Sequence, residues 1–162
     1  MASVKKTIVV LGATGAQGSS VVKYLLEAKQ WDVVALTRST DSDKAKALVA
    51  QGIRVVKGDA NDPASLDAAF KGVYGVFALT NFWEGVFTGQ NADPVGAEVR
   101  QGHNIADACK RQGVKHVVWS TLDPCNVPHF QSKHEVGEHF KQLGVPTTHL
   151  YTSFYYENMH MF

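Results

Sequence analysis

The sequence has little of what defines several large classes of protein. Its two cysteines, Cys109 and Cys125, are too few for a disulfide framework and lack the spacing of a metal site. A net charge of +1 leaves no electrostatic footprint for DNA or for an anionic membrane. No apolar run approaches the length of a membrane span, and the first residues leave no room for a signal peptide before the first apolar run. We therefore predict a reduced, cytosolic protein that binds neither nucleic acid nor membrane.

Length and patterning predict one α/β domain with a doubly wound parallel sheet. The 162 residues are 44% hydrophobic and 19% charged, which suits a globular domain with a substantial core. Short β-type runs alternate with helical patterns, and right-handed crossovers then cover both faces of a parallel sheet. The predicted strands are 7–11, 33–36, 53–57, 73–79, 115–120 and 147–151, and the predicted helices are 19–28, 43–51, 64–70, 95–112 and 131–143. Residues 61–63 predict a helix start, and residues 81–94 predict an irregular loop at the active side.

A glycine-rich turn is the most informative motif. Residues 9–18 read VVLGATGAQG, so an apolar strand leads through three glycines into an amphipathic run. This is the context of a dinucleotide site: Gly12 allows the turn, Gly15 allows close approach to a pyrophosphate, and Gly18 allows tight helix packing. The start of the helix would then offer N–H groups to the phosphates. The alternative is a tight turn that binds no ligand.

Arg38 follows the second predicted strand, where such folds meet the adenosine ribose. An acid there favours NAD, whereas an arginine accommodates the 2′-phosphate of NADP. No acid occupies this end, because Asp32 lies at the start of the strand. We therefore predict that the site prefers NADP(H) to NAD(H). The alternative is that Arg38 is a solvated loop residue.

Asp59 follows the third predicted strand and has two interpretations. Its carboxylate could accept a hydrogen bond from the adenine amino group, or it could be an ordinary turn residue.

With these motifs the chain resembles the NmrA-like family, atypical members of the short-chain dehydrogenase/reductase superfamily, over nearly its whole length. The NADP-sensing members look closer than the isoflavone-reductase relatives. The segments that carry the resemblance are GATGAQG at 12–18, TR at 37–38, GD at 58–59, TNFWE at 80–84, HFQSK at 129–133, GVPTT at 144–148 and YYEN at 155–158.

The resemblance implies a set of residues around NADP(H). The diphosphate and the 2′-phosphate would be held by Gly12, Ala13, Thr14, Gly15, Ala16 and Gln17 together with Arg38, Ser39, Thr40, Asp41 and Ser42. The adenine would border Asp59 and Ala60, and the ribose and nicotinamide side would border Thr80, Asn81 and Phe82. The nicotinamide ribose would meet Lys133, the nicotinamide pocket would be closed by Tyr155, Tyr156, Glu157 and Asn158, and a basic residue that family members often carry would correspond to Arg100. Residues 84–99 look longer than the matching loop of those relatives, which weakens the last assignment.

Whether a reaction occurs depends on Lys133 and His129. The superfamily's usual acid is a tyrosine four residues before the lysine, and this chain has His129 there, a loss that NmrA-like proteins commonly share. Imidazole can donate a proton but is shorter than a phenol. Ser120 and Thr121 end the fifth predicted strand, near the place where a hydroxyl would orient the substrate carbonyl. Each of them could equally be an ordinary strand-end residue whose hydroxyl binds backbone. Lys133 and His129 are the catalytic candidates.

Other histidines and cysteines predict no further chemistry. His129, His134 and His139 recur every five residues, which spreads them around a helix, so we expect no metal. Cys109 is predicted to lie in the core.

Three functions remain open. The first is an NADP(H) redox sensor without turnover that acts on a protein partner, a transcription factor in fungal relatives, which also allows a nuclear location. The second is an NADPH-dependent reductase of a small carbonyl, quinone or enone that uses Lys133. The third is a decayed paralogue that binds nothing.

Family members continue past Phe162, so we expect one domain, residues 1–162, without the C-terminal lobe. Apolar surface near Phe154, Tyr155, Met159 and Phe162 would then favour self-association.

Overall fold

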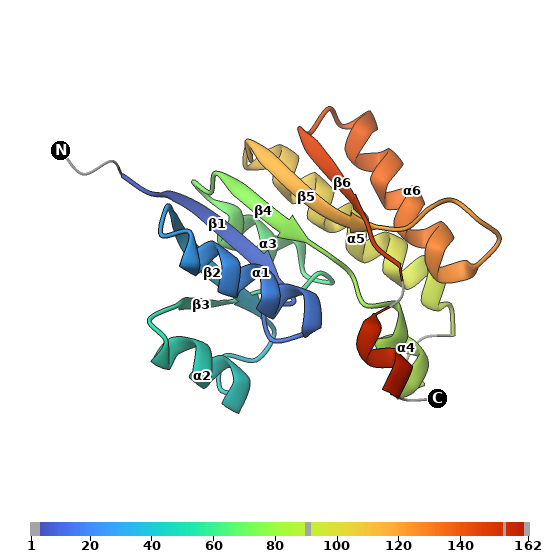
Figure 1. Ribbon diagram of the computed structural model, residues 1–162. Coiled ribbons are helices and arrows are strands. Elements are labelled where there is room, and N and C mark those ends of the chain that lie inside the picture. Colours follow the sequence, from blue (N-terminus) through green and yellow to red (C-terminus); the bar gives the residue numbers. More distant parts are fainter. Residues whose placement is uncertain (1–3, 90–91, 154, 161–162) are drawn as a thin grey trace.

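The computed structural model describes residues 4–89, 92–153 and 155–160, and its centre is a sheet of parallel strands. The six strands lie in the order β3-β2-β1-β4-β5-β6 (Figure 1). They are β1 (Lys6–Leu11), β2 (Trp31–Thr37), β3 (Arg54–Lys57), β4 (Gly75–Ala78), β5 (His116–Thr121) and β6 (Thr147–Tyr151). The order confirms the predicted doubly wound fold. Because the chain leaves β1 toward β2 and later returns to its other side as β4, a crevice opens where β1 and β4 end.

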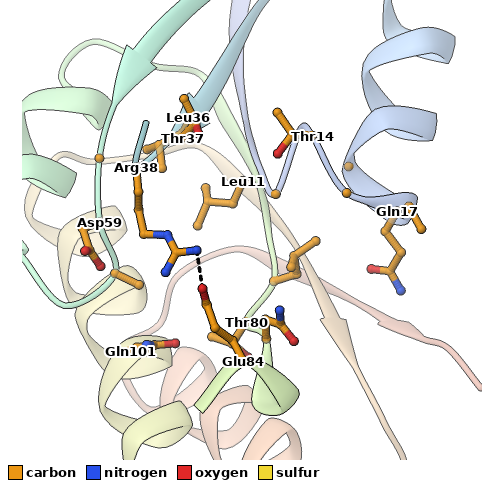
Figure 2. Close-up of a pocket in the computed structure, with 18 of the residues that line it drawn as sticks. Leu11, Thr14, Gln17, Leu36, Thr37, Arg38, Asp59, Thr80, Glu84 and Gln101 are labelled. Atoms are coloured by element: carbon orange, nitrogen blue, oxygen red, sulfur yellow. Dashed lines mark hydrogen bonds and ion pairs between the residues drawn. The ribbon is translucent and has the colours of Figure 1, made fainter. Parts of the chain in front are cut away.

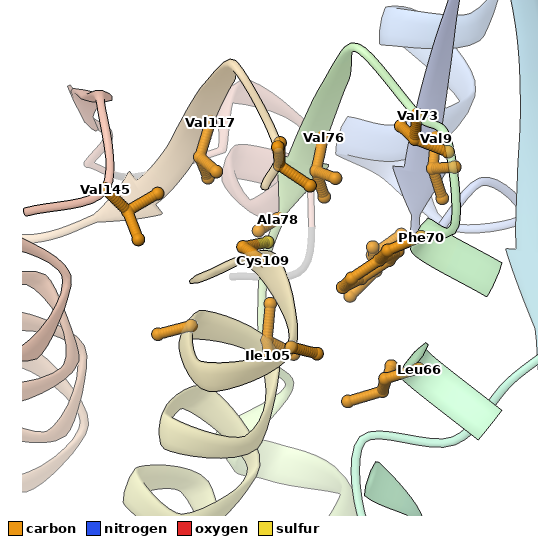
Figure 3. Close-up of a cluster of buried hydrophobic side chains, with 14 of the residues drawn as sticks. Val9, Leu66, Phe70, Val73, Val76, Ala78, Ile105, Cys109, Val117 and Val145 are labelled. Atoms are coloured by element: carbon orange, nitrogen blue, oxygen red, sulfur yellow. The ribbon is translucent and has the colours of Figure 1, made fainter. Parts of the chain in front are cut away.

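Helices cover both faces of the sheet. They are α1 (Ala16–Glu27), α2 (Asp43–Ala50), α3 (Pro63–Phe70), α4 (Phe82–Thr88), α5 (Pro94–Arg111) and α6 (Pro128–Gln142), followed by the 3₁₀ helix η1 (Tyr156–His160). The helices α1 and α2 cover one face of the sheet and α3, α5 and α6 the other, while α4 and η1 lie beyond the ends of the strands (Figure 1). One buried cluster joins α1 and α2 to the sheet through side chains such as Val22 and Leu48. The other joins α3, α5 and α6 to the opposite face through Phe70, Ile105 and Phe140. Figure 3 shows part of this cluster, with Phe70 and Ile105 below the strand residues Val9 and Val76. Cys109 is fully buried in the second cluster, as predicted.

Side-chain caps explain where several helices begin. Asp62 Oδ1 accepts hydrogen bonds from the backbone N–H groups of Ala64 and Ser65, and Pro63 occupies the first turn. The helix start predicted at residues 61–63 is therefore confirmed. Ser42 caps α2 in the same way, by accepting from the N–H of Ala45.

Two predictions from the sequence need correction, and one element lies outside the predictions. Residues 81–94, predicted as an irregular loop, contain the helix α4, which ends at Thr88 and is followed by Gly89 in the left-handed region (φ 63°). The helix predicted to start at Gln131 starts three residues earlier, at Pro128, since proline suits the first helical position. The N-cap residue Val127 makes no side-chain cap, so the sequence lacks the usual polar signal for this start. The 3₁₀ turn η1 was not predicted at all.

Among the helices of the described residues, none is both long and apolar enough to cross a membrane.

Candidate functional site

The glycine turn after β1 has the geometry that the sequence predicts. Gly12 lies in the left-handed region with φ of 62°, and the N–H of Gly15 donates to the Gly12 carbonyl at 2.8 Å. α1 then begins at Ala16, and no side chain caps its first turn. The N-terminal end of α1 therefore faces the crevice with its backbone donors and the positive end of its dipole, the arrangement that suits an anion.

Gly15 and Gly18 serve different purposes in this turn. A Cβ on Gly18 would lie 2.2 Å from the Gly12 carbonyl oxygen, so glycine is needed there for α1 to approach the turn. A Cβ on Gly15 would meet only the same oxygen, at an ordinary contact distance of 3.4 Å. Its φ of −99° suits any residue. Packing within the protein therefore requires Gly18 but does not require Gly15.

A cleft of about 400 Å³ opens beside this turn, at the carboxyl ends of the central strands (Figure 2). Its walls come from the turns after β1, β2, β3 and β4 together with α4, α5 and the segment before η1. The lining residues are Leu11, Gly12, Thr14, Gly15, Ala16, Gln17, Gly18, Leu36, Thr37, Arg38, Gly58, Asp59, Ala60, Leu79, Thr80, Asn81, Glu84, Gln101 and Tyr155. The structure thus brings together eleven of the predicted site residues: Gly12, Thr14, Gly15, Ala16, Gln17, Arg38, Asp59, Ala60, Thr80, Asn81 and Tyr155.

Arg38 reaches into the cleft from the end of β2 and forms an ion pair with Glu84 of α4. Its Nη2 lies 2.5 Å from Glu84 Oε1. The hydrogen bond from Arg38 to Glu84 raises the pKa of the guanidinium, and the charges of Glu84 and Asp59 act in the same direction. Asp32, at the other end of β2, binds Arg54 instead. Arg38 is therefore the basic group at the predicted ribose end, and an acid faces it across the cleft.

Asp59 and Ala60 line the cleft and also hold its wall in place. Asp59 Oδ1 accepts from the backbone N–H of Asn61 at 2.8 Å, so the carboxylate closes a turn. The Ala60 carbonyl accepts from the side chain of Asn104 on α5 at 2.8 Å. The two interpretations of Asp59 are compatible, because one carboxylate oxygen closes the turn while the residue faces the cleft.

Lys133 of α6 lies in a buried polar network behind Thr80. Its Nζ donates to the Thr80 carbonyl at 2.9 Å, to Thr80 Oγ1 at 3.1 Å and to Glu98 Oε1 at 2.8 Å. An ammonium group has three N–H donors, so these three acceptors use all of them. The Lys133 side chain is 14% exposed and does not line the cleft, whereas its partner Thr80 does.

Glu98 of α5 is the centre of that network. Its side chain is 1% exposed, and its two oxygens accept from Lys133, from Thr80 Oγ1 at 2.7 Å and from Ser132 Oγ. A buried carboxylate is tolerated only when it is paired and hydrogen-bonded in this way. The network therefore fixes α5, α6 and the end of β4 to one another at the base of the cleft.

The end of β5 supports the same network. The indole N–H of Trp119 and the hydroxyl of Thr121 both donate to the backbone carbonyl of Lys133, at 3.0 and 3.2 Å. Ser120 Oγ donates to Gln17 Oε1 at 2.8 Å and so ties the glycine turn to β5. Thr121 therefore behaves as a strand-end residue whose hydroxyl binds backbone, which is one of the two interpretations given above. The hydroxyl of Ser120 instead binds the side chain of Gln17.

His129 lies one turn before Lys133 on α6 but packs among aromatic rings. Its ring centroid is 5.1 Å from that of Trp83 and 5.6 Å from that of Phe82. It is not among the residues that line the cleft. The phenol of the usual catalytic tyrosine is thus replaced by an imidazole packed against α4.

Other predicted residues lie outside the cleft. Ala13 is 1% exposed and belongs to the core under α1. Ser42 caps α2, Phe82 is buried beside His129, and Arg100 is exposed on α5. Ser39, Thr40, Asp41, Lys133, Tyr156 and Asn158 also do not line the cleft, and the side chain of Glu157 lies outside the described residues.

Sequence reasoning missed two acids. Glu84 lies in the TNFWE segment, but no role follows from the segment itself because its partner Arg38 is 46 positions away. Glu98 could have been found by helical phase, since it falls on the same stripe of α5 as Gly102, Ile105 and Cys109. A glutamate on an apolar stripe indicates a buried partner.

The described part of the chain brings no three His, Cys, Asp or Glu side chains together in a way that could hold a metal ion. Burial raises the pKa of the Cys109 thiol to about 12, which makes it a poor nucleophile.

Comparison with known proteins agrees with this geometry. The chain is 34% identical over 145 residues to the NmrA-like family domain-containing oxidoreductase FrzB of Cladobotryum sp., a match that covers 85% of this chain and 42% of that protein. The solved structure of the Citrobacter sp. triphenylmethane reductase complexed with NADP(H) superposes with a TM-score of 0.80 at 26% identity, over 94% of this chain and 51% of that one. The negative transcriptional regulator NmrA in complex with NADP superposes with a TM-score of 0.77 at 29% identity, over 95% of this chain and 47% of that one.

The chain therefore spans about half the length of the solved structures, and less than half of FrzB. The model of the NmrA-like family matches residues 4–162, nearly the whole sequence. With the glycine turn, the strand order and the cleft in agreement, the chain belongs to the NmrA-like family.

Proposed function

We propose that this chain binds a nicotinamide dinucleotide in the cleft, that it prefers NADP(H) to NAD(H), and that it senses the redox state of the cofactor for a protein partner without turning it over. The observation that carries the proposal is the joint placement of the glycine turn and Arg38 along one cleft. The first suits a pyrophosphate and the second a 2′-phosphate. Triphenylmethane reductase with NADP(H) and NmrA with NADP or with NAD, all similar in fold, support the binding of a nicotinamide dinucleotide.

The state of Lys133 favours binding over catalysis. In the superfamily pattern the lysine meets the nicotinamide ribose and a tyrosine supplies the proton. Here all three donors of Lys133 go to Thr80 and Glu98, and His129 packs against α4. A reaction would require Lys133 to exchange one of these acceptors for a ligand hydroxyl, and His129, at the position of the usual tyrosine, does not line the cleft.

A protein partner needs a surface near the cleft. Large apolar side chains on α4 and around η1 are exposed, with 81% of Phe87, 84% of Tyr156 and 64% of Met159 accessible. Exposed apolar patches of this kind serve association. These residues adjoin Glu84 and Tyr155, which line the cleft, so a change in the cleft has a short path to the surface. Phe154 and Phe162, also predicted to be exposed, lie outside the described residues.

Replacing Arg38 tests the preference for NADP. We expect Arg38→Ala to weaken NADP⁺ binding by about 10- to 100-fold, because charge-assisted hydrogen bonds to the 2′-phosphate are lost. NAD⁺ binding should change little. Calorimetric titration of both cofactors measures the ratio. Arg54→Ala is the matched control, since the Arg54 side chain is equally exposed (59%) and also ion-paired, but lies at the start of β3. Equal loss of NADP⁺ and NAD⁺ affinity in Arg38→Ala would contradict the assignment.

The second candidate function is an NADPH-dependent reductase of a small carbonyl, quinone or enone. It is favoured by one observation, the position of the Lys133 ammonium directly behind Thr80 at the cleft. A screen of quinones and aldehydes by NADPH absorbance separates the two functions. The sensor proposal predicts no turnover. Lys141→Ala, a change at the exposed end of α6, is the control for Lys133→Ala. If the protein turns over a substrate, and this turnover survives in Lys141→Ala but is lost in a folded Lys133→Ala variant, the chain is a reductase and the sensor proposal is wrong. If saturating NADP⁺ leaves the melting temperature unchanged, neither function holds.

A further inference from the structure

The ion pair between Arg38 and Glu84 places an acid at the ribose end of the cleft although the second strand provides none. Figure 2 shows the two side chains reaching toward each other, Arg38 from the end of β2 and Glu84 from α4. Both residues line the cleft. The ribose end therefore holds a guanidinium and a carboxylate together, in direct contact.

These two groups favour different ligands. A guanidinium binds a 2′-phosphate through paired N–H donors, whereas a carboxylate accepts a hydrogen bond from a ribose 2′-hydroxyl. In a dinucleotide-binding fold the acid normally comes from the end of the second strand. Here the end of β2 carries Arg38, and the acid comes from α4 on the other wall, beyond the next two strands along the chain.

We propose that Glu84 sets how strongly this site discriminates between 2′-phosphorylated and unphosphorylated nicotinamide dinucleotides. This inference rests on the proposed dinucleotide site. The contact joins Nη2 of Arg38 to Glu84 Oε1, so the guanidinium has further N–H groups that can bind a 2′-phosphate. That phosphate must nevertheless lie close to the Glu84 carboxylate, and the two anions repel each other and compete for the charge of Arg38. An unphosphorylated ribose meets no such competition, and its 2′-hydroxyl can donate to Glu84 while the ion pair stays closed.

Two consequences follow. The preference for the phosphorylated cofactor is smaller than Arg38 alone would give, because part of the guanidinium's interaction is already satisfied by Glu84. The phosphorylated cofactor also weakens the contact between β2 and α4, because its phosphate competes with Glu84 for the charge of Arg38, whereas the unphosphorylated cofactor does not. The competition is electrostatic at a partly exposed pair, so it weakens as ionic strength rises.

The test is the ratio of NADP⁺ to NAD⁺ affinity in Glu84→Gln, measured by calorimetry at low ionic strength. Glutamine keeps the size of the side chain but removes the charge. We expect NADP⁺ to bind about fivefold more tightly than in the unmodified protein, the size of an exposed ion pair, while NAD⁺ binds equally or more weakly. Glu84→Asp, which keeps the charge, should stay close to the unmodified protein.

Glu27→Gln is the matched control, because it removes the same charge at an exposed position at the far end of α1. It should leave the ratio unchanged. If both cofactors bind the unmodified protein but Glu84→Gln shifts the ratio no more than Glu27→Gln does, Glu84 has no part in discrimination and the proposed function stands. If neither cofactor binds the unmodified protein, the proposed function fails and this inference fails with it.

Discussion

Gly18→Ala should destabilise the protein strongly, whereas Gly15→Ala should leave its stability nearly intact and abolish tight cofactor binding. The two glycines lie three residues apart, but only at Gly18 would the new Cβ overlap the backbone, at 2.2 Å from the Gly12 carbonyl oxygen. Backbone cannot move aside as a flexible side chain can. α1 must therefore shift away from the turn.

Overpacking of this kind costs about 3 kcal/mol of the free energy of unfolding, a large part of the total for one domain. For a chain of this size that lowers the melting temperature by roughly 10 °C. At Gly15 the added methyl group stays at an ordinary contact distance within the protein, but in the proposed site it would obstruct the approach of the pyrophosphate. Thermal melting and calorimetry on both variants measure the two effects separately. Normal cofactor affinity in Gly15→Ala would show that the pyrophosphate does not lie on this turn.

Glu98→Ala should have the other large effect, a loss of about 3–5 kcal/mol in the free energy of unfolding. The substitution leaves the Lys133 ammonium, only 14% exposed, without its counter-charge, and it leaves the hydroxyls of Thr80 and Ser132 without their acceptor. Chemical denaturation measures the loss. Glu135→Ala, at an exposed glutamate on α6, is the control and should stay within about 0.5 kcal/mol of the unmodified protein.

The double variant Glu98→Ala/Lys133→Met separates the charge from the packing. If the cost comes from an unpaired buried ammonium, replacing that ammonium by an apolar chain of similar length should restore much of the stability. Additive losses in the double variant would show instead that the two residues contribute independently, and that the network is not a single unit.

The sequence predicts the fold of this chain well because the signals are local. The apolar strands, the glycine turn after β1 and the Asp62 cap are each encoded within a few residues. The helix α4 was missed because its sequence, FWEGVFT, has an internal glycine and aromatic residues, which resemble a binding loop more than a helix. Its helical form depends on packing, with the Phe82 side chain buried among the rings of Trp83 and His129.

The site was predicted less completely because its polar contacts join residues far apart in sequence. The glycine turn and Arg38 follow from their strands, since parallel strands bring their ends to one edge. The partners of Arg38 and Lys133 do not follow, because Glu84 and Glu98 reach them across 46 and 35 positions. Only the fold decides that α4 faces the end of β2 and that the apolar stripe of α5 meets α6.

The central claim is that a nicotinamide dinucleotide lies along the cleft between the glycine turn and Arg38. Amide NMR of the isotope-labelled chain, titrated with NADP⁺, tests it most directly because it locates the ligand residue by residue. We expect the largest shifts at Gly12–Gly18, Arg38, Asp59–Ala60 and Thr80–Asn81. The smaller hollow lined by Thr7, Arg54 and Lys71 should stay unchanged. Shifts confined to that second hollow, or no shifts at millimolar NADP⁺, would contradict the account.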